Sequence, residues 1–259
     1  MIARCSPLEQ YQAWKALITA GDPVSAWQKA YVYIYQAFIE KDRWKQYLNG
    51  VGTTLYVTAM ALVLGVILGM IVAIVRAAHD QQRPGRHNPI LGLLNGVFKV
   101  YVTVIRGTPM MVQLLIMGFV IFSSSKNFAL VGALTLGINS GAYQAEIIRG
   151  GLMSVDAGQM EAGRSLGLPF WTTMTKVIMP QAIRNILPAL CNEGITLLKE
   201  TSIAGYIGIV DLTKAAMLIR SQTYDAFIPL IFVALIYLVI VLVLQYLVGR
   251  LERRLNSAY

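Results

Sequence analysis

The stretch EAGRSLGLPFWTTMTKVIMP, residues 161–180, is a polar segment inside an oily chain. It carries two glycines, two prolines and the charged residues Glu161, Arg164 and Lys176. Of the 259 residues of the chain, 56% are hydrophobic and only 14% are charged, against about 25% charged in an ordinary soluble domain. A segment that can face water therefore lies in the middle of a chain with the composition of a membrane protein.

Four uncharged runs indicate membrane-spanning helices, at 55–75, 107–125, 127–145 and 226–249. Each run approaches or exceeds the roughly 18–20 residues that a helix needs to cross the hydrocarbon core. The runs predict an all-α integral membrane protein with a transmembrane domain over 49–250. Its five spans are expected at about 52–75, 98–123, 128–148, 186–210 and 226–249. The fourth contains Pro188, Glu193 and Glu200, which favours a broken or shielded helix over a lipid-facing one.

The distribution of the net charge of +9 indicates how the chain is oriented in the membrane, rather than binding to nucleic acid. Basic residues gather in the first loop (Arg76, Arg83 and Arg86), within 149–184, and directly after the last span. Because Lys and Arg collect on the cytoplasmic side of membrane proteins, these regions and the tail 251–259 are predicted to be cytoplasmic. Five spans then place the N-terminus outside, although residues 1–48 carry six basic residues.

Residues 1–48 are rich in aromatic side chains, and Trp27, Tyr31 and Phe38 recur at helical spacing. This pattern predicts one or two amphipathic helices, which either lie at the membrane interface or pack on their own bundle. Cys5 and Cys191 form no spaced set, so we expect neither a disulfide framework nor a metal site. His79 and His87 fall in the first loop, where a metal pair is conceivable but surface histidines are the simpler interpretation.

The polar segment over 154–182 is predicted to fold as two short helices. Asp156 and Gln159 have the spacing of a capping box, so the first helix should start there and run to a left-handed stop at Gly167. Pro169 suits the start of the second helix, and Pro180 should end it. Gly163 and Gly167 remove side chains from one side, so the surface of another protein could approach closely. The segment is too apolar for a disordered loop, and a docking element is the better interpretation.

Four motifs in order resemble one known family. Glu161, Ala162 and Gly163, followed by Gly167 and by the residues IMP at 178–180, look like the EAA loop of bacterial ATP-binding-cassette (ABC) importer permeases. Three further stretches match the polar-amino-acid branch of that family: RGTPMMVQL at 106–114, AYQAEIIRGG at 142–151 and LLKETSIAGYIG at 197–208. The resemblance covers about residues 50–250, and it departs from the usual pattern at Gly163, where alanine is common, and at Met179, where leucine is common.

The resemblance implies a five-helix importer-permease (MetI-like) fold in the bacterial cytoplasmic, or inner, membrane. It implies a second permease subunit, identical or different, and an extracytoplasmic amino-acid-binding protein. Two ABC ATPase subunits would each grip one EAA loop through the residues Glu161, Ala162, Gly163, Leu166 and Gly167. The chain contains no Gly-Lys dipeptide and hence no P-loop. ATP with Mg²⁺ is therefore expected on the partner ATPase, and this chain is expected to be a transport subunit without an enzyme activity or a cofactor of its own.

An amino acid in transit offers a carboxylate and an ammonium group, and ionisable residues within a membrane are costly enough to indicate function. Candidates to contact it are Arg106, Thr108, Gln113, Asn139, Tyr143, Glu146, Glu193 and Glu200. The helix start after Thr108 would direct a positive dipole end at the carboxylate. Structural alternatives remain open: Glu146 could pair with Arg149, Glu200 and Lys199 could brace the fourth helix, and Arg106 could mark the membrane edge.

Three other functions fit the sequence less well. A related permease for another solute, such as methionine or a phosphonate, differs only in the flanking motifs. An ion-coupled secondary transporter would leave the cytoplasmic two-helix segment without a task. A membrane-embedded hydrolase would need a nucleophile, a base and a stabilising group within reach of one another, and the sequence offers no such set.

Overall fold

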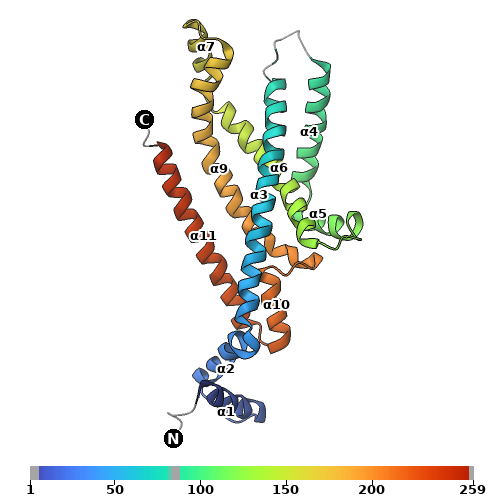
Figure 1. Ribbon diagram of the computed structural model, residues 1–259, viewed down its shortest axis with the longest axis vertical. Helices are drawn as coiled ribbons and strands as arrows, with labels where there is room; N and C mark the ends of the chain where they lie inside the picture. The colour runs from blue at the N-terminus through green and yellow to red at the C-terminus, as the bar shows by residue number, and fades with distance from the viewer. Residues whose placement is uncertain (1–5, 81, 83–87, 257–259) are drawn as a thin grey trace. The chain divides into compact units, whose positions relative to one another are not determined.

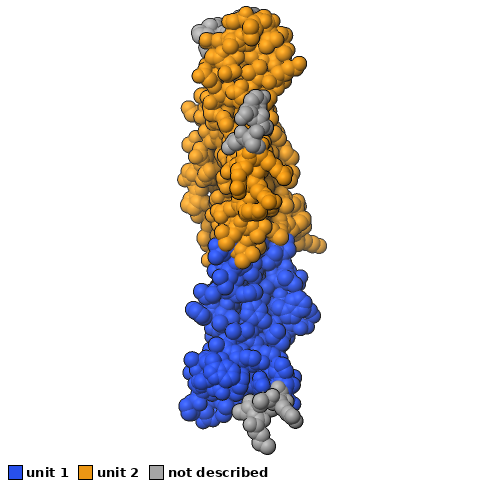
Figure 2. Space-filling view, turned by 90° about the vertical axis from the view of Figure 1, so that its left-hand side faces the viewer, with its two compact units in different colours: residues 1–54, 210–238 blue, residues 55–209, 239–259 orange. Residues whose placement is uncertain are grey.

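The computed structural model describes residues 6–80, 82 and 88–256, and within these ranges the chain is helical and contains no strand (Figure 1). The helices are α1 (Pro7–Ala20), α2 (Ala26–Phe38), α3 (Trp44–Asp80), α4 (Pro89–Gly107), α5 (Met110–Ile116), α6 (Phe128–Met153), α7 (Ala157–Ser165), α8 (Phe170–Thr173), α9 (Met179–Glu200), α10 (Leu212–Thr223) and α11 (Phe227–Asn256). Unit 1 comprises residues 1–54 and 210–238, and unit 2 comprises 55–209 and 239–259 (Figure 2). The predicted all-α class is confirmed, whereas the predicted boundaries at 48 and 250 stay predictions.

Helix α6 lies at the centre of unit 2, with buried residues along its length from Val131 to Ile148, and it packs on α4, α5 and α9. It also meets α3 at very close range. A Cβ placed on Gly65 would lie 2.8 Å from Gln144 Nε2, and one placed on Gly69 would lie 2.8 Å from Gln144 Cβ. The two glycines, four residues apart, therefore allow α3 and α6 to approach one another.

The second predicted span, 98–123, consists of two helices in the structure, which meet at Thr108 and Pro109. Helix α4 begins before the predicted start, at Pro89, where Asn88 Oδ1 accepts a hydrogen bond from the backbone N–H of Ile90 at 3.0 Å. It ends at Gly107, because Thr108 precedes a proline and is extended (φ −118°, ψ 144°). The chain resumes as α5 and a π-helical turn, Met117–Ile121.

Pro180 does not end the second helix of the polar segment, contrary to the prediction. Helix α8 leads through a π-helical turn, Met174–Ile178, directly into α9, and Pro180 occupies the first turn of α9. A proline removes one backbone donor, and the wider π-helical turn just before it absorbs the change of register. Helix α9 also continues through Pro188, and the expected break comes at Glu200, where a 3₁₀-helix, Thr201–Ile207, follows.

In unit 1, helices α1 and α2 form an antiparallel pair, and α2 packs on α10. Tyr11 stacks on Tyr35 with ring centroids 4.3 Å apart, and the ring of Phe38 lies 4.4 Å from that of Phe232 at the start of α11. The N-terminal segment therefore packs on its own bundle through one face, which is one of the two predicted alternatives. Trp27 meets the ring of the buried Trp14 edge-on at 4.7 Å and yet is 60% exposed, and a contact with the membrane interface stays a prediction.

By length and composition, three helical stretches in the described part of the chain can cross a membrane: Glu40–Asp80, Pro89–Gly107 and Phe227–Leu255. A bent pair, Phe170–Ile207 with Leu212–Thr223, would be a fourth. Helix α6 has 26 residues but carries Asn139, Ser140 and Gln144 in its middle, which lower its hydropathy. Five membrane crossings therefore stay a prediction that depends on α6, the most enclosed helix of unit 2.

Several predictions concern residues outside the described ranges. They are Cys5, Arg83, Arg86, His87 and the last three residues of the tail 251–259. Of the two histidines, His79 is the one that the structure describes, and its Nδ1 lies 3.2 Å from Nδ2 of Asn95. Within the described ranges, no three His, Cys, Asp or Glu residues are grouped as a metal site would require.

Candidate functional site

The polar segment folds as an elbow between α7 and α8. Asp156 is the N-cap of α7, and its Oδ1 accepts a hydrogen bond from the backbone N–H of Gly158 at 2.6 Å. At the other end, Gly167 has φ +76° and donates to Arg164 O at 3.0 Å, while Leu168 N donates to Gly163 O at 3.0 Å. These two hydrogen bonds are those of a Schellman stop, which requires a left-handed residue at Gly167. The predicted start and stop of this helix are confirmed.

Gly163 does not offer a bare surface to a partner, contrary to expectation. It is buried, and a Cβ placed on it would lie 2.7 Å from Thr173 Oγ1 and closer still to the methyl group of Thr173. Gly163 therefore lets α7 pack on α8, which explains why glycine stands where alanine is common. Gly167 has no atom within 4 Å of such a Cβ and faces open space. Glu161 and Ala162 are exposed on α7.

The elbow carries large apolar side chains that the rest of the chain does not cover. Leu166 is 80% exposed and Trp171 is 73% exposed, and the ring of Phe170 meets that of Trp171 edge-on at 5.4 Å. Apolar groups of this size, set in a rigid turn between two helices, are typical of a surface that another protein covers.

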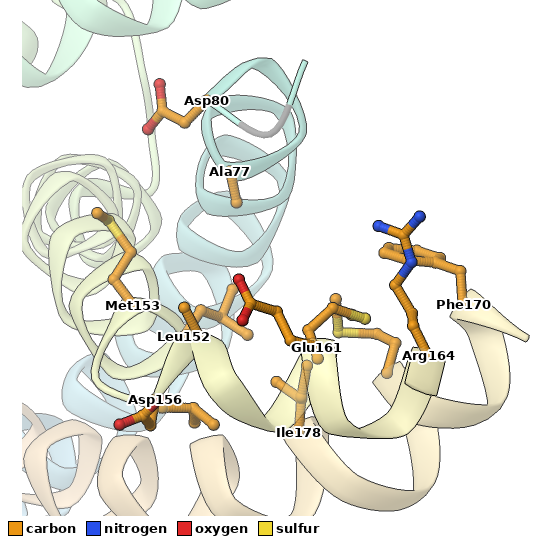
Figure 3. A pocket seen from close by; sticks show the side chains of 13 residues that line it. Ala77, Asp80, Leu152, Met153, Asp156, Glu161, Arg164, Phe170 and Ile178 are labelled. Carbon is orange, nitrogen blue, oxygen red and sulfur yellow. The ribbon is translucent and has the colours of Figure 1, made fainter. Parts of the chain in front are cut away.

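A pocket of about 520 Å³ opens beside the elbow, between α7, α8 and the ends of α3 and α6 (Figure 3). Its wall is largely apolar and includes Met153, Met160 and Met174, whose flexible side chains adapt to varied contacts. Glu161 and Arg164 rise from α7 on its rim in Figure 3. The elbow is thus a hollowed surface with one charge of each sign.

An ion cluster lies between the ends of α3 and α6. Glu146 pairs with Arg76 of α3 and with Arg149 Nη2, at 3.3 Å, on its own helix. Arg149 Nη1 lies 3.7 Å from Asp80 Oδ2. Glu146 therefore has two cationic partners, which supports the structural alternative for this residue and makes it a weak candidate to bind cargo.

The break at Thr108 and Pro109 is braced by Gln113. Its Nε2 donates to Ile105 O at 2.8 Å and to Thr108 Oγ1 at 2.7 Å, and so satisfies a carbonyl at the end of α4. Its Oε1 accepts from Nδ2 of the buried Asn139 at 2.9 Å. Three predicted residues, Thr108, Gln113 and Asn139, therefore come together, but their polar groups are engaged with one another.

Two further candidates, Arg106 and Tyr143, form a pair on the surface. The guanidinium carbon of Arg106 lies 5.1 Å from the ring centroid of Tyr143, which is a cation–π contact. Both residues are exposed. The contact orients the cation of Arg106 without neutralising it.

Glu193 joins a buried polar chain that the sequence did not single out. Its Oε1 accepts from Ser140 Oγ at 3.0 Å, and Gln144 Nε2 donates to Ser140 Oγ at 2.9 Å. Gln144 is fully buried, and among the described residues its Oε1 has no hydrogen-bond partner. The signal in the sequence was a polar pair four residues apart on an apolar helix, with Gly65 and Gly69 opposite.

Glu200 lies seven residues after Glu193, about two helical turns further along the same face of α9. The candidates thus fall into three groups, around the α4–α5 break, the ion cluster and the polar row on α9. Helix α6 contributes Asn139, Ser140, Tyr143 and Glu146 to these groups. Helix α6 therefore contributes residues to each of these three groups.

Comparison with known proteins identifies close relatives. Residues 88–257 match the family described as "Binding-protein-dependent transport system inner membrane component". The "Arginine transport system permease protein ArtQ" of Bacillus subtilis (strain 168) is 36% identical over 81% of this chain and 92% of that protein. The "Putative glutamine transport system permease protein GlnP" of Rickettsia typhi is 34% identical over 80% of this chain and 92% of that protein.

A solved structure described as "Crystal structure of an amino acid ABC transporter with histidines" matches with a TM-score of 0.72 and 42% sequence identity. The match covers 81% of this chain and 94% of that chain. The fold and the family expected from the four sequence motifs are therefore both confirmed.

Proposed function

The chain belongs to the family of binding-protein-dependent transport system inner membrane components, and on this premise we propose that it is the permease subunit of an ATP-driven ABC importer for a polar amino acid. It is an inner-membrane protein and a transport subunit. The observation that carries the coupling mechanism is the α7–α8 elbow, because its exposed Leu166 and Trp171 need a covering partner.

In the proposed importer, two ATPase subunits each bind one elbow, and ATP with Mg²⁺ is held by those subunits. The elbow suits force transmission because its two helices are locked to each other through Gly163 and Thr173. A movement of the ATPase against Leu166 or Trp171 would therefore move α7 and α8 together, and α8 continues into α9 without a flexible link. A second permease subunit would complete the path, and an extracytoplasmic binding protein would deliver the amino acid.

For the cargo, the polar row on α9 is the proposed site for the ammonium group. Glu193 and Glu200 lie on one face of that helix, and Ser140 orients the carboxylate of Glu193. Arg106 is the proposed partner of the cargo carboxylate, since its charge is free of any acidic partner that the described contacts show. The names of the relatives, arginine and glutamine transport permeases, fit a cargo with a zwitterionic backbone and a polar side chain.

A transport assay tests this proposal. The permease is reconstituted in liposomes with its ATPase subunits and binding protein, and uptake of radiolabelled arginine, glutamine, histidine and glutamate is measured with and without ATP. Glu200→Gln should lower uptake more than tenfold and leave the subunit stoichiometry intact, whereas the control Glu252→Gln on α11 should change little. Unchanged uptake in Glu200→Gln would remove the residue from the path, and uptake of methionine or a phosphonate alone would change the cargo class. Uptake driven by an ion gradient without ATP would contradict the importer.

A further inference from the structure

The turn between α10 and α11 exposes one aromatic side chain almost completely. Tyr224 is 95% exposed, the highest fraction among the exposed large apolar side chains in the part of the chain that the structure describes. Its backbone is left-handed, with φ 56° and ψ 17°, a conformation that costs a side-chain-bearing residue about 1–2 kcal/mol. Glycine or asparagine ends a helix in this way at lower cost. The side chain of Tyr224 therefore packs little against the described residues, and its ring is available for a contact outside the chain.

The neighbours of Tyr224 complete a small recognition surface. Arg220, Ser221 and Tyr224 line a shallow hollow of about 360 Å³. Arg220 lies four residues before Tyr224, so the two side chains are neighbours on the surface. Phe227, the first residue of α11, is 69% exposed. Tyrosine and arginine dominate the binding energy of protein interfaces, and a cation in this position favours an acidic patch on the partner.

The turn is held rigidly from both sides. Tyr224 N donates to Arg220 O at 2.9 Å, and Asp225 caps α11 by accepting from Phe227 N at 3.1 Å. Behind it, Gln222 Oε1 accepts from Nε of the buried Arg43 at 3.1 Å. A preorganised surface loses little entropy when it binds.

Arg43 in turn links this turn to the N-terminal helices. Its Nη1 donates to Glu40 Oε2 at 2.8 Å, and Glu40 Oε1 accepts from Tyr11 OH and from Lys15 Nζ, each at 2.9 Å. The hydrogen bond to Tyr11, together with Glu40, raises the pKa of Lys15 against a smaller opposing effect of burial. Helices α1 and α2 therefore serve as a brace for α10. Glu40 thereby pairs two of the six basic residues of segment 1–48, Lys15 and Arg43.

The five-span order predicted from the sequence places the α10–α11 turn outside. The turn follows the predicted fourth span, 186–210, and precedes the fifth, 226–249, and the basic residues Arg253 and Arg254 come in the last turn of α11. Because basic residues collect on the cytoplasmic side, that end of α11 is predicted to be cytoplasmic and the start of the fifth span extracytoplasmic.

We propose that Tyr224 and Arg220 form a docking point for the extracytoplasmic binding protein, with the aromatic ring as anchor and the guanidinium facing an acidic patch. The proposal rests on the proposed importer function. It assigns to this turn the partner that arrives from outside, rather than a second copy of the chain or a lipid headgroup.

The test measures binding of the binding protein to the complete importer in lipid nanodiscs, using the binding protein that stimulates ATP hydrolysis by the wild-type complex. Tyr224→Ala and, separately, Arg220→Glu should each weaken binding at least tenfold. A higher salt concentration should weaken binding to the wild-type importer and should have a smaller effect on binding to Arg220→Glu. Tyr246→Ala is the matched control, because Tyr246 is also an exposed tyrosine with an arginine, Arg250, 5.1 Å from its ring centroid. It should bind like the wild type.

The outcomes separate this proposal from the importer function. If no binding protein stimulates the wild-type complex, the importer function itself fails. If the wild type is stimulated and both variants bind with unchanged affinity, the docking point is elsewhere. The proposal would also be overturned if the variants bound the binding protein with unchanged affinity but altered dimerisation of the permease, which would assign the turn to a second copy. It would be overturned likewise if they altered only retention by anionic vesicles, which would assign the turn to lipid.

Discussion

Two turns between helices of this chain each contain a residue in the left-handed backbone conformation, but the two residues differ in kind. At the α7–α8 elbow the residue is Gly167, with φ +76°, and the exposed apolar groups belong to its neighbours Leu166 and Trp171. At the α10–α11 turn the residue is Tyr224, with φ +56°, and it is itself the exposed group. The first turn uses the residue that such a backbone favours, whereas the second keeps a bulky side chain in spite of it.

The difference separates two kinds of recognition. At the elbow, recognition depends on the backbone conformation of Gly167, because this conformation fixes the angle between α7 and α8 and presents both helices to a partner. In the α10–α11 turn the side chain is what matters, and the backbone tolerates it because Arg43, Asp225 and the helix ends fix the chain on both sides. Substitutions should therefore act through geometry at the first turn and through chemistry at the second.

The largest effect is expected from Arg43→Met, which removes the brace of the second turn. Removing one partner of a buried ion pair lowers the free energy of unfolding by about 3–5 kcal/mol. Because Lys15 still pairs with Glu40 in the variant, we expect a decrease near the lower end of this range. The midpoint of thermal unfolding in nanodiscs should fall, and binding of the binding protein should weaken. The control Lys45→Met removes an exposed partner of Asp42 and should change the midpoint little. An equal effect of both variants would mean that Arg43 does not brace α10.

A second large effect is expected at the elbow from Gly167→Val. A β-branched residue is strongly disfavoured at positive φ, so the angle between α7 and α8 should change and association with the ATPase should weaken about tenfold or more. Gly167→Asn should change association with the ATPase little, because asparagine tolerates the left-handed conformation. Titration of the ATPase subunits onto the permease measures both. Equal losses in the two variants would show that the elbow senses any side chain, and not the backbone angle.

An intermediate effect is expected from Gly163→Ala, which restores the residue common in the family. The added methyl group meets Thr173, and overpacking of this kind costs about 1–3 kcal/mol. Thr173→Ala removes the clashing atoms, so the double variant should recover most of the ATP hydrolysis that Gly163→Ala loses. Failure of the second substitution to restore it would mean that Gly163 acts in the interface with the ATPase after all.

The smallest effect on stability, and of opposite sign, is expected from Tyr224→Gly. Relief of the left-handed strain should stabilise the protein by about 1 kcal/mol or less, after the added entropy of the unfolded chain is deducted. Binding of the binding protein should nevertheless weaken. Differential scanning calorimetry measures the stability, and a binding titration on the same preparation measures the affinity for the binding protein. A variant that is less stable and binds normally would reverse the assignment of the second turn.

The sequence predicted what depends on local pattern and composition. Uncharged run length indicated the membrane class, and Asp156 and Gly167 marked the bounds of α7. In these cases the residues that decide the structure are neighbours in sequence or act through their own backbone.

Predictions that depended on contacts between distant residues were less successful. Gly163 was expected on a free surface, but Thr173 covers it, and nothing in the spacing of the two residues required that packing. Pro180 was expected to end a helix, but a π-helical turn accommodates it. Gln144 was passed over because the sequence does not show that it and Ser140, four residues earlier, lie beside Glu193 of another helix. Tyr224 could not be recognised either, since exposure and backbone angle are properties of the folded chain.

The measurement that tests the central claim most directly is the rate of ATP hydrolysis by the importer in nanodiscs. It is recorded with and without binding protein, over a panel of amino acids, for the wild type and for Gly167→Arg. We predict stimulation of the wild type by one class of polar amino acid and loss of that stimulation when a bulky charge stands at the elbow. Absence of any association with the ATPase, together with uptake driven by an ion gradient, would contradict the account of residues 161–180 as the coupling element.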